Sequence, residues 1–126
     1  MHRVFVYGSL KRGFYNNTLL HESRFIGERI TQDETWIMRS LGGFPGVVRK
    51  LHGGMSASIF GDLYEVDDMT LARLDRLENN GHFYSRELVK LRDENEMAWM
   101  YVLKNEHSYG RDMQPFFEGE SFIYRW

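Results

Sequence analysis

The sequence has no cysteine, no long apolar run and no surplus of basic side chains. The absence of cysteine excludes disulfide scaffolds, thiol nucleophiles and thiolate metal ligands. No stretch approaches the roughly 18 apolar residues that a membrane-spanning helix needs. The apolar run at residues 4–7 is also far shorter than that of a signal peptide. We therefore expect a cytoplasmic protein with no membrane partner.

Charge and composition limit the partners further. Sixteen Lys and Arg residues against eighteen Asp and Glu residues give a formal net charge of −2. No basic surplus is available to bind a phosphate backbone, so we expect no nucleic-acid partner. With 126 residues, of which 42% are hydrophobic, the chain has the size and composition of one globular domain over residues 1–126. We expect a monomer or a small homo-oligomer.

Strand patterns dominate the chain, in keeping with an aromatic share of 15%. Runs rich in β-branched and aromatic residues predict strands at residues 3–7, 25–31, 36–40, 58–66, 84–91 and 97–103. The last two runs flank the polar residues 93–96 and form a predicted hairpin. Residues 42–46 are rich in Gly and Pro and predict a turn between two strands.

One segment changes from period-two alternation to helical spacing. An aspartate at residues 67–68 is a suitable N-cap for a helix that ends near Glu78. Three leucines share one face of this helix and are expected to point inward: Leu71, Leu74 and Leu77. A second, shorter helix is predicted at residues 18–23. Together the elements indicate a mainly antiparallel α+β domain that forms a small barrel.

The usual signatures of nucleotide, acyl-transfer and metal chemistry are incomplete. Residues 8–13 have the spacing of a phosphate-binding loop, but Phe14 and Tyr15 occupy the places of its Lys and its Ser or Thr. There is no Gly-x-Ser-x-Gly nucleophile elbow. The five histidines never fall at His-x-x-x-His spacing, so we expect no metal site. We also expect no cofactor.

A predicted strand that runs into a tight turn is the first candidate binding site. The residues of this turn are Tyr7, Gly8, Ser9 and Leu10. Successive backbone N–H groups in a glycine-containing turn form a concavity that accepts an anion such as a carboxylate. Because Gly8 has no Cβ, a ligand can approach the main chain closely there. The same residues are also compatible with a plain, sharp strand end.

Glu78, at the C-terminal end of the predicted helix, is the second candidate. A carboxylate beside the negative end of a helix dipole is disfavoured in its charged form, so the pKa of Glu78 should be raised. Asp75 lies three residues earlier and would act in the same direction if it is close. A raised carboxylate pKa suits a general base near neutrality. The alternative is a solvated glutamate after a helix.

Five segments resemble, in order, the motifs of the gamma-glutamylcyclotransferase-like superfamily. They are residues 4–13 (VFVYGSLKRG), 43–46 (GFPG), 61–66 (GDLYEV), 74–78 (LDRLE) and 84–86 (YSR). The resemblance spans residues 3–103, most of the chain. The continuation LKRG at residues 10–13 is similar to the gamma-glutamylamine cyclotransferase branch.

This resemblance implies a small mixed, mainly antiparallel barrel with flanking helices, a pocket at residues 7–10 and Glu78 as the catalytic residue. It implies a small gamma-glutamyl substrate whose α-amine attacks its own γ-carbonyl carbon, releasing 5-oxoproline and the free amine or amino acid. Because the nucleophile belongs to the substrate, such a protein needs no Ser, Cys or metal. A carboxylate with a raised pKa can take the proton of the α-ammonium group and protonate the leaving amine.

The sequence leaves alternatives for the roles of several other residues and for the function of the protein. Tyr84 closes the pocket or hydrogen-bonds the substrate, whereas Arg86 binds the substrate or pairs with a structural carboxylate. Residues 44–46 form a rigid turn or a pocket wall, and the tail from residue 105 covers the barrel or the pocket. A non-catalytic binding module would keep the same pocket, although it would gain nothing from a base at Glu78. An enzyme that removes a gamma-glutamyl tag from a biosynthetic intermediate would keep the chemistry.

Overall fold

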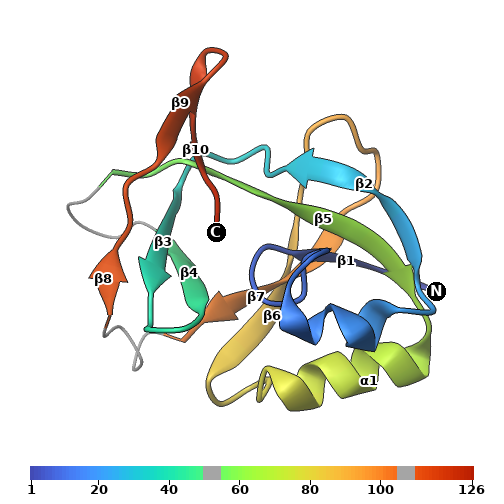
Figure 1. Ribbon diagram of the computed structural model, residues 1–126. Coiled ribbons are helices and arrows are strands. Elements are labelled where there is room, and N and C mark those ends of the chain that lie inside the picture. Colours follow the sequence, from blue (N-terminus) through green and yellow to red (C-terminus); the bar gives the residue numbers. More distant parts are fainter. Residues whose placement is uncertain (50–54, 105–109) are drawn as a thin grey trace.

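The structure is a computed structural model that describes residues 1–49, 55–104 and 110–126. Ten strands occur in chain order with two helices (Figure 1). The strands are β1 (His2–Val6), β2 (Arg24–Ile30), β3 (Trp36–Ser40), β4 (Pro45–Arg49), β5 (Ser58–Val66), β6 (Tyr84–Val89), β7 (Ala98–Leu103), β8 (Arg111–Asp112), β9 (Phe116–Glu118) and β10 (Ser121–Tyr124). The helices are the 3₁₀ helix η1 (Tyr15–Leu20) and the α-helix α1 (Asp68–Leu77).

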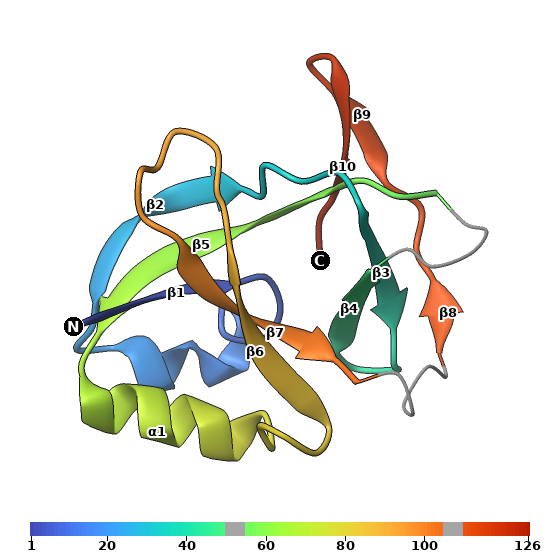
Figure 2. The same ribbon diagram turned by 180° about the vertical axis from the view of Figure 1, so that it is seen from behind.

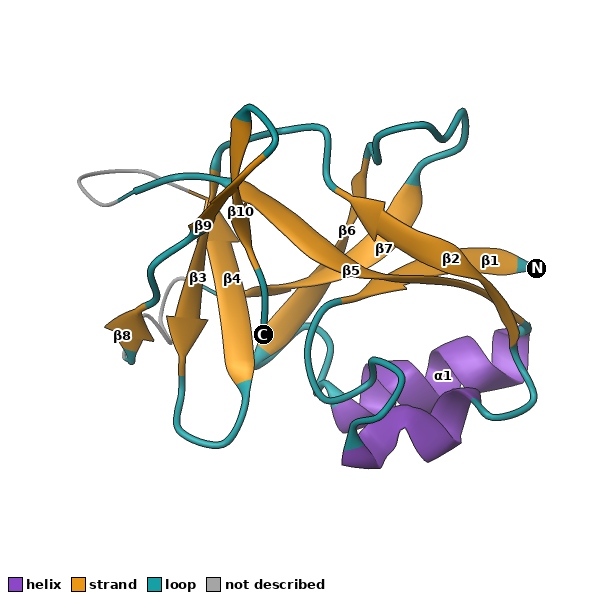
Figure 3. Cartoon of the chain, turned by 45° about the horizontal axis from the view of Figure 1, so that its top comes forward, coloured by secondary structure: helices purple, strands orange, loops and turns teal. Residues whose placement is uncertain are grey.

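The strands form one large and one small sheet, which Figure 3 shows in orange beside the purple helices. The large sheet has seven strands in the order β6-β7-β1-β5-β10-β9, and β2 also pairs with β5. Its β1–β7 and β10–β5 pairs are parallel, whereas the others are antiparallel. The small sheet is antiparallel in the order β4-β3-β8. A mixed α+β fold is therefore confirmed.

The expected closed barrel is not confirmed. Within the described residues the ladders leave two separate sheets with free edges. An isolated bridge pairs Thr31 with Leu91, just beyond the ends of β2 and β6. A second bridge pairs Trp36 with Ala57 and ties the small sheet to the segment before β5. Single bridges of this kind bring the strands together without the continuous hydrogen bonding of a closed barrel.

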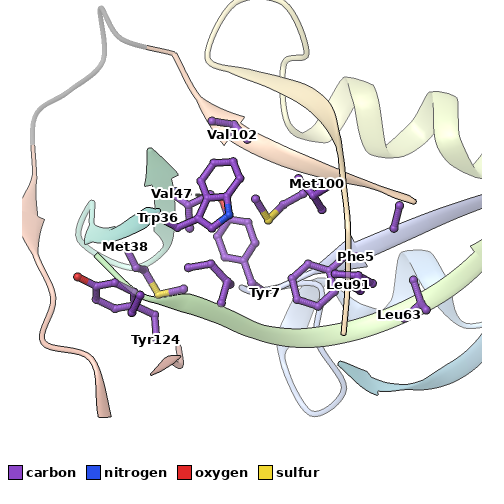
Figure 4. Close-up of a cluster of buried hydrophobic side chains, with 14 residues drawn as sticks. Phe5, Tyr7, Trp36, Met38, Val47, Leu63, Leu91, Met100, Val102 and Tyr124 are labelled. Atoms are coloured by element: carbon purple, nitrogen blue, oxygen red, sulfur yellow. Dashed lines mark hydrogen bonds between the residues drawn. The ribbon is translucent and has the colours of Figure 1, made fainter. Parts of the chain in front are cut away.

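Alternation along β1 distributes apolar side chains to two hydrophobic clusters. Phe5 and Tyr7 belong to a cluster with Trp36 and other small-sheet residues, which Figure 4 shows in close-up. Val4 and Val6 belong to the other cluster, together with leucines of α1 and η1. Successive strand residues point to opposite faces, so β1 is buried on both sides. The end of β1 is thereby held rigidly where the candidate turn begins.

The helix α1 begins as the sequence predicts, but the side chain of its last residue does not point inward as predicted. The Asp67 carboxylate accepts a hydrogen bond from the Thr70 amide at 2.7 Å, which is standard N-capping. Leu71 and Leu74 are buried, but Leu77 is 42% exposed, so the expectation that all three point inward is wrong for the last. Leu77 is the final residue of the helix, and its side chain lines a cavity instead of the core.

Two further elements have bounds that differ by a few residues from those predicted. The short helix predicted at residues 18–23 is the 3₁₀ helix η1, which starts and ends earlier at Tyr15–Leu20. Pro45 and Gly46, predicted in a turn, begin β4 and pair with Ser40 and Arg39. The predicted hairpin is confirmed, because β6 and β7 pair antiparallel over their full lengths.

The C-terminal part of the chain extends the large sheet. β10 lies parallel to β5, and its residues Ile123 and Tyr124 are buried. Figure 2 shows the β9–β10 hairpin standing away from α1, at the far side of the molecule. The described tail therefore covers the core between the sheets, and residues 105–109 lie outside the described part. No helix of the described residues is long and apolar enough to cross a bilayer.

Candidate active site

A cavity of about 350 Å³ opens where four chain segments meet. These are the end of β1, the end of α1, and the residues at the starts of β4 and β6, and side chains of η1 and β7 complete the lining. Six of the seven residues predicted for the site line this cavity: Tyr7, Gly8, Ser9, Leu10, Glu78 and Tyr84. Arg86 is the seventh and is absent from the described lining. Two segments separated by almost 70 positions, the first turn and Glu78, thus share one site.

The turn after β1 is closed by its own main chain. The Lys11 amide donates to the Gly8 carbonyl at 3.0 Å, and the Asn16 amide donates to the Ser9 carbonyl at 3.1 Å. The Ser9 hydroxyl accepts a further bond from the Asn16 side-chain amide at 2.8 Å. Within the described residues, the amides at positions 8–10 donate to no acceptor. Three adjacent unpaired donors in a cavity wall are suited to an anion or a developing oxyanion.

Packing against Pro45 requires a glycine at position 8. A Cβ built on Gly8 would lie 2.8 Å from Cγ of Pro45, closer than real Cβ atoms approach. The ring of Pro45 therefore lies against the main chain of the turn. This contact fixes the distance between the turn and the start of β4, so the cavity wall there has little freedom to move.

Glu78 caps the C-terminus of α1, and its amide donates to the Leu74 carbonyl at 2.9 Å. Its carboxylate is half-buried and accepts no hydrogen bond from a described residue. Burial raises the pKa of Glu78 from 4.5 to about 7. The direction is the one predicted, but the cause is loss of hydration on burial rather than the charge of Asp75.

Asp75 differs because one oxygen of its carboxylate accepts two hydrogen bonds. Arg86 donates from Nε to Oδ1 of Asp75 at 2.8 Å, and the Tyr101 hydroxyl donates to the same oxygen at 2.7 Å. The Arg86 guanidinium also stacks on Trp99, with its central carbon 4.4 Å from the ring centroid. The geometry of Arg86 thus matches the structural alternative, in which it pairs with a carboxylate, and it contributes no wall to the cavity.

Two buried tyrosines hold the cavity walls in place. The Tyr7 hydroxyl donates to the Tyr101 carbonyl at 2.7 Å and accepts from the Val47 amide at 3.2 Å. Burial raises the pKa of Tyr7 well above its usual value, so the phenol stays neutral. The Tyr84 hydroxyl donates to the Pro45 carbonyl at 2.7 Å. Tyr84 thereby ties the start of β6 to the start of β4.

Some lining residues were not predicted from the sequence. Leu77, Asn79, Phe83 and Tyr101 reach the cavity from segments that flank the predicted residues. The Asn-Asn-Gly sequence after α1 is typical of a turn and could have pointed to the segment that contains Leu77 and Asn79. In the structure Asn79 adopts the left-handed conformation expected of such a turn, with φ of 50°. The possible pocket wall at residues 44–46 is present in part, because the side chains of residues 44 and 45 line the cavity.

The described residues contain no group of three or more His, Cys, Asp or Glu side chains that could hold a metal ion. The described lining combines the main-chain amides of the turn with the Glu78 carboxylate. A carboxylate with a pKa near neutrality beside a row of unpaired main-chain amides is an arrangement suited to general acid–base catalysis.

Comparison with known proteins defines the class to which this fold and site belong. The family model for gamma-glutamyl cyclotransferase, AIG2-like, matches residues 4–122. The chain therefore belongs to the gamma-glutamyl cyclotransferase, AIG2-like family. The matched range contains the turn, Glu78 and every other predicted site residue.

Individual relatives agree with this family. A Vibrio cholerae relative is 36% identical over 106 residues, which cover 84% of this chain and 85% of the relative. The Escherichia coli K12 gamma-glutamylcyclotransferase family protein YtfP is 33% identical over 100 residues, covering 79% and 80%. A mouse AIG2-like protein shares the fold with a TM-score of 0.71 at 22% identity, covering 96% of this chain and 87% of the mouse chain.

Proposed function

We propose that this protein is a gamma-glutamyl cyclotransferase that converts a small gamma-glutamyl amine or amino acid into 5-oxoproline and the free amine. The observation that carries the proposal is Glu78: a half-buried carboxylate without a described partner, with its pKa raised to about 7, in the same cavity as the unpaired amides of residues 8–10. Family membership and relatives bearing the gamma-glutamylcyclotransferase name support the same chemistry.

In the proposed reaction the substrate supplies its own nucleophile. Glu78 takes a proton from the α-ammonium group, and the freed amine attacks the γ-carbonyl carbon to form the ring C–N bond. The protonated Glu78 gives this proton to the amide nitrogen of the leaving group as the original C–N bond breaks. The ring nitrogen then loses its second proton through Glu78 to the released amine, which departs as an ammonium ion. The carboxylate therefore ends the cycle as it began. Proton transfer of this kind contributes roughly 10²–10⁴-fold to a rate.

The turn at residues 8–10 has the complementary role in this proposal. Its three amides donate to the α-carboxylate of the substrate or to the oxygen of the γ-carbonyl group as negative charge develops on it. Holding the substrate folded brings amine and carbonyl together, and well-oriented intramolecular reactions reach effective molarities of about 10⁵–10⁸ M. Binding geometry and one base are sufficient for this chemistry, and no metal or cofactor enters it.

The direct test measures 5-oxoproline release from gamma-glutamyl amino acids, gamma-glutamyl-ε-lysine and gamma-glutamyl amines. Release of 5-oxoproline from at least one class in stoichiometric amounts with the amine supports the proposal. A folded protein that binds these compounds and releases none would identify a binding module. Free glutamate as the product would indicate hydrolysis and would contradict cyclisation.

Gly8→Val tests the position of the binding site. The new side chain collides with Pro45 and displaces the turn, so we expect KM to rise by at least about tenfold, or binding to be lost. Gly43→Val is the matched control, because a Cβ at Gly43 meets no atom within 4 Å. A normal KM in a folded Gly8→Val protein would place the substrate elsewhere.

A further inference from the structure

The direction of the amides at residues 8–10 depends on where the carbonyl groups of the same turn point. In a planar trans peptide the carbonyl of one residue and the N–H of the next point in opposite directions. The Ser9 amide therefore points away from the Gly8 carbonyl, and the Leu10 amide points away from the Ser9 carbonyl. The groups that hold these two carbonyls thus determine where the amide donors are directed.

Both carbonyls accept hydrogen bonds from main-chain donors that follow the turn. The Gly8 carbonyl is held by the Lys11 amide at 3.0 Å, and the Ser9 carbonyl by the Asn16 amide at 3.1 Å. Asn16 belongs to η1, whereas Lys11 lies outside every described helix and strand. The direction of the Lys11 amide depends in turn on the Leu10 carbonyl, because the two belong to one peptide group.

One side chain of η1, that of Asn17, holds this Leu10 carbonyl. Nδ2 of Asn17 donates to the Leu10 carbonyl oxygen at 2.7 Å and to the Tyr64 hydroxyl of β5 at 3.1 Å. A carbonyl oxygen only accepts hydrogen bonds, so the amide nitrogen of Asn17 has to face it. Tyr64 is buried with 3% exposure, so Asn17 is tied to the core of the large sheet.

The hydrogen bonds therefore form a series from the sheet to the cavity. Asn17 holds the Leu10 carbonyl, the same peptide directs the Lys11 amide to the Gly8 carbonyl, and that carbonyl sets the direction of the Ser9 amide. Asn17 itself is absent from the described cavity lining. Its effect on a ligand is therefore exerted through the turn.

We propose that Asn17 is a positioning residue of the active site, which directs the Ser9 amide toward the negatively charged oxygen of the substrate by holding the Leu10 carbonyl. The inference rests on the proposed function, because it assigns the support of the anion-binding turn in the same site. Asn17 neither touches the substrate nor transfers a proton. Its removal leaves the base and the cavity walls in place and misdirects one hydrogen-bond donor.

Amide hydrogen exchange measured by NMR tests the structural part without a substrate. In Asn17→Ala the Leu10 carbonyl loses its donor, so exchange of the Lys11 amide should become at least about tenfold faster. The Glu78 amide, which donates to the Leu74 carbonyl, is the reference and should keep its rate. An unchanged rate at Lys11 would overturn the inference, and equal acceleration at both amides would show general destabilisation instead.

Kinetics test the consequence for the reaction. We expect Asn17→Ala to lower kcat/KM for 5-oxoproline release by roughly 10- to 100-fold, because a misplaced donor loses much of its effect on the transition state. The rise of kcat/KM with pH through about 7 should persist, since Glu78 is unchanged. A change that only destabilised the fold would leave kcat/KM of the folded molecules unaltered.

Asn17→Asp separates hydrogen bonding from side-chain volume. Aspartate has the size of asparagine, but its ionised carboxylate at pH 8 has no N–H to donate to the Leu10 carbonyl. We therefore expect Asn17→Asp to be at least as impaired as Asn17→Ala. An Asn17→Asp protein with the kcat/KM of the wild type would contradict the inference, because volume alone would then be sufficient.

Tyr64→Phe is the matched control on the other side of Asn17. It removes the hydroxyl and keeps the ring, which packs edge-to-face on Phe25 with centroids 5.4 Å apart. The bond from Asn17 to the Leu10 carbonyl remains, so we expect kcat/KM to change by less than about threefold. A loss equal to that of Asn17→Ala would assign the effect to the contact between η1 and β5 and would overturn the inference.

Titration with 5-oxoproline, the proposed product, separates failure of this inference from failure of the proposed function. Weaker binding of 5-oxoproline by Asn17→Ala supports the positioning role even if the wild type releases none, in which case only the catalytic proposal fails. Unchanged affinity with a reduced kcat/KM supports an amide that acts on the developing oxyanion, whereas unchanged values of both overturn the inference. If the wild type neither binds nor releases 5-oxoproline, the proposed function fails, and exchange at Lys11 alone decides whether Asn17 orients the turn.

Discussion

Two carboxylates near the end of α1, Asp75 and Glu78, have opposite surroundings although only three positions separate them. Asp75 accepts hydrogen bonds from Arg86 and Tyr101, which come from β6 and β7. Glu78 is half-buried beside the cavity, accepts no bond from a described residue and has a pKa raised to about 7.

In this comparison Asp75 is the carboxylate that stabilises the fold, and Glu78 is the carboxylate proposed to act in the reaction. The Asp75 carboxylate is held in place by two donors from neighbouring strands. A buried acid without donors exchanges its proton near neutral pH, at a cost in stability when it is charged. Functional sites commonly carry such unsatisfied groups, whereas the surrounding fold pairs its charges.

The largest expected effect comes from Glu78→Gln. The substitution keeps the size of the side chain and removes the base, so we expect kcat to fall by roughly 10²–10⁴. In the wild type, kcat/KM should rise with pH through about 7 as Glu78 loses its proton, and this acidic limb should vanish in the variant. Glu22→Gln, at an exposed position, is the control. Wild-type turnover by Glu78→Gln would exclude Glu78 as the base.

Asp75→Asn should affect the fold more than the reaction. The change leaves Arg86 without its charged partner, and we expect the free energy of unfolding to fall by about 1–3 kcal/mol in urea denaturation. The loss in kcat should stay well below the roughly 10²-fold expected for removal of a general base. A stable protein with a kcat as low as that of Glu78→Gln would reverse the roles assigned to the two acids.

The pH dependence of stability sharpens the comparison. The pKa of Glu78 is about 7 in the folded protein, against roughly 4.3 for a free glutamate. Between these values the folded state holds a proton that the unfolded state has lost, so this group's contribution to stability falls as the pH rises to about 7. Glu78→Gln should therefore be more stable than the wild type at pH 8, by about 1–2 kcal/mol.

The same comparison at pH 5 is the internal control for this prediction. At that pH most of the folded wild type is protonated at Glu78 and resembles the Gln variant, so the difference in melting temperature should shrink. A difference of constant size at both pH values would show that the stabilisation does not come from the charge of Glu78.

The smallest effect on stability is expected for Leu77→Ala, beside Glu78. Leu77 is 42% exposed, so its truncation should cost less than about 1 kcal/mol, whereas Leu74→Ala should cost about 2–5 kcal/mol because Leu74 is fully buried. Since Leu77 lines the cavity, its truncation should raise KM while unfolding in urea hardly changes. A loss as large as that of Leu74→Ala would mean that Leu77 belongs to the core.

Most secondary structure could be predicted because its signals are local. The strand Trp36–Ser40 has the predicted bounds, and the helix has the predicted aspartate cap and ends at Leu77, next to Glu78. Alternating and helical patterns specify which side chains share a face over a few residues. The closed barrel was not confirmed, because closure depends on pairing between strand edges that are far apart in sequence.

The site was predicted in part for the same reason. Gly8 and Glu78 stand out by their own turn and helix positions, and family motifs tie them together. The place of Phe83 in the cavity lining has no local signal, because it depends on packing against Phe44, which lies far away in the sequence. The role of Arg86 likewise depends on Asp75 and Trp99, to which no spacing in the sequence points.

The sequence by itself determined the order of the helices and of most strands before residue 104, the aspartate cap of α1, the glycine turn after β1 and the position of Glu78. Only the tertiary structure decided that Asp75 is hydrogen-bonded while Glu78 is buried away from water. Hydrogen bonds within a turn or helix connect neighbours in the chain, so the sequence specifies them directly. Burial and charge pairing are set by segments from distant positions, so they exist only once the sheet and helices have packed together.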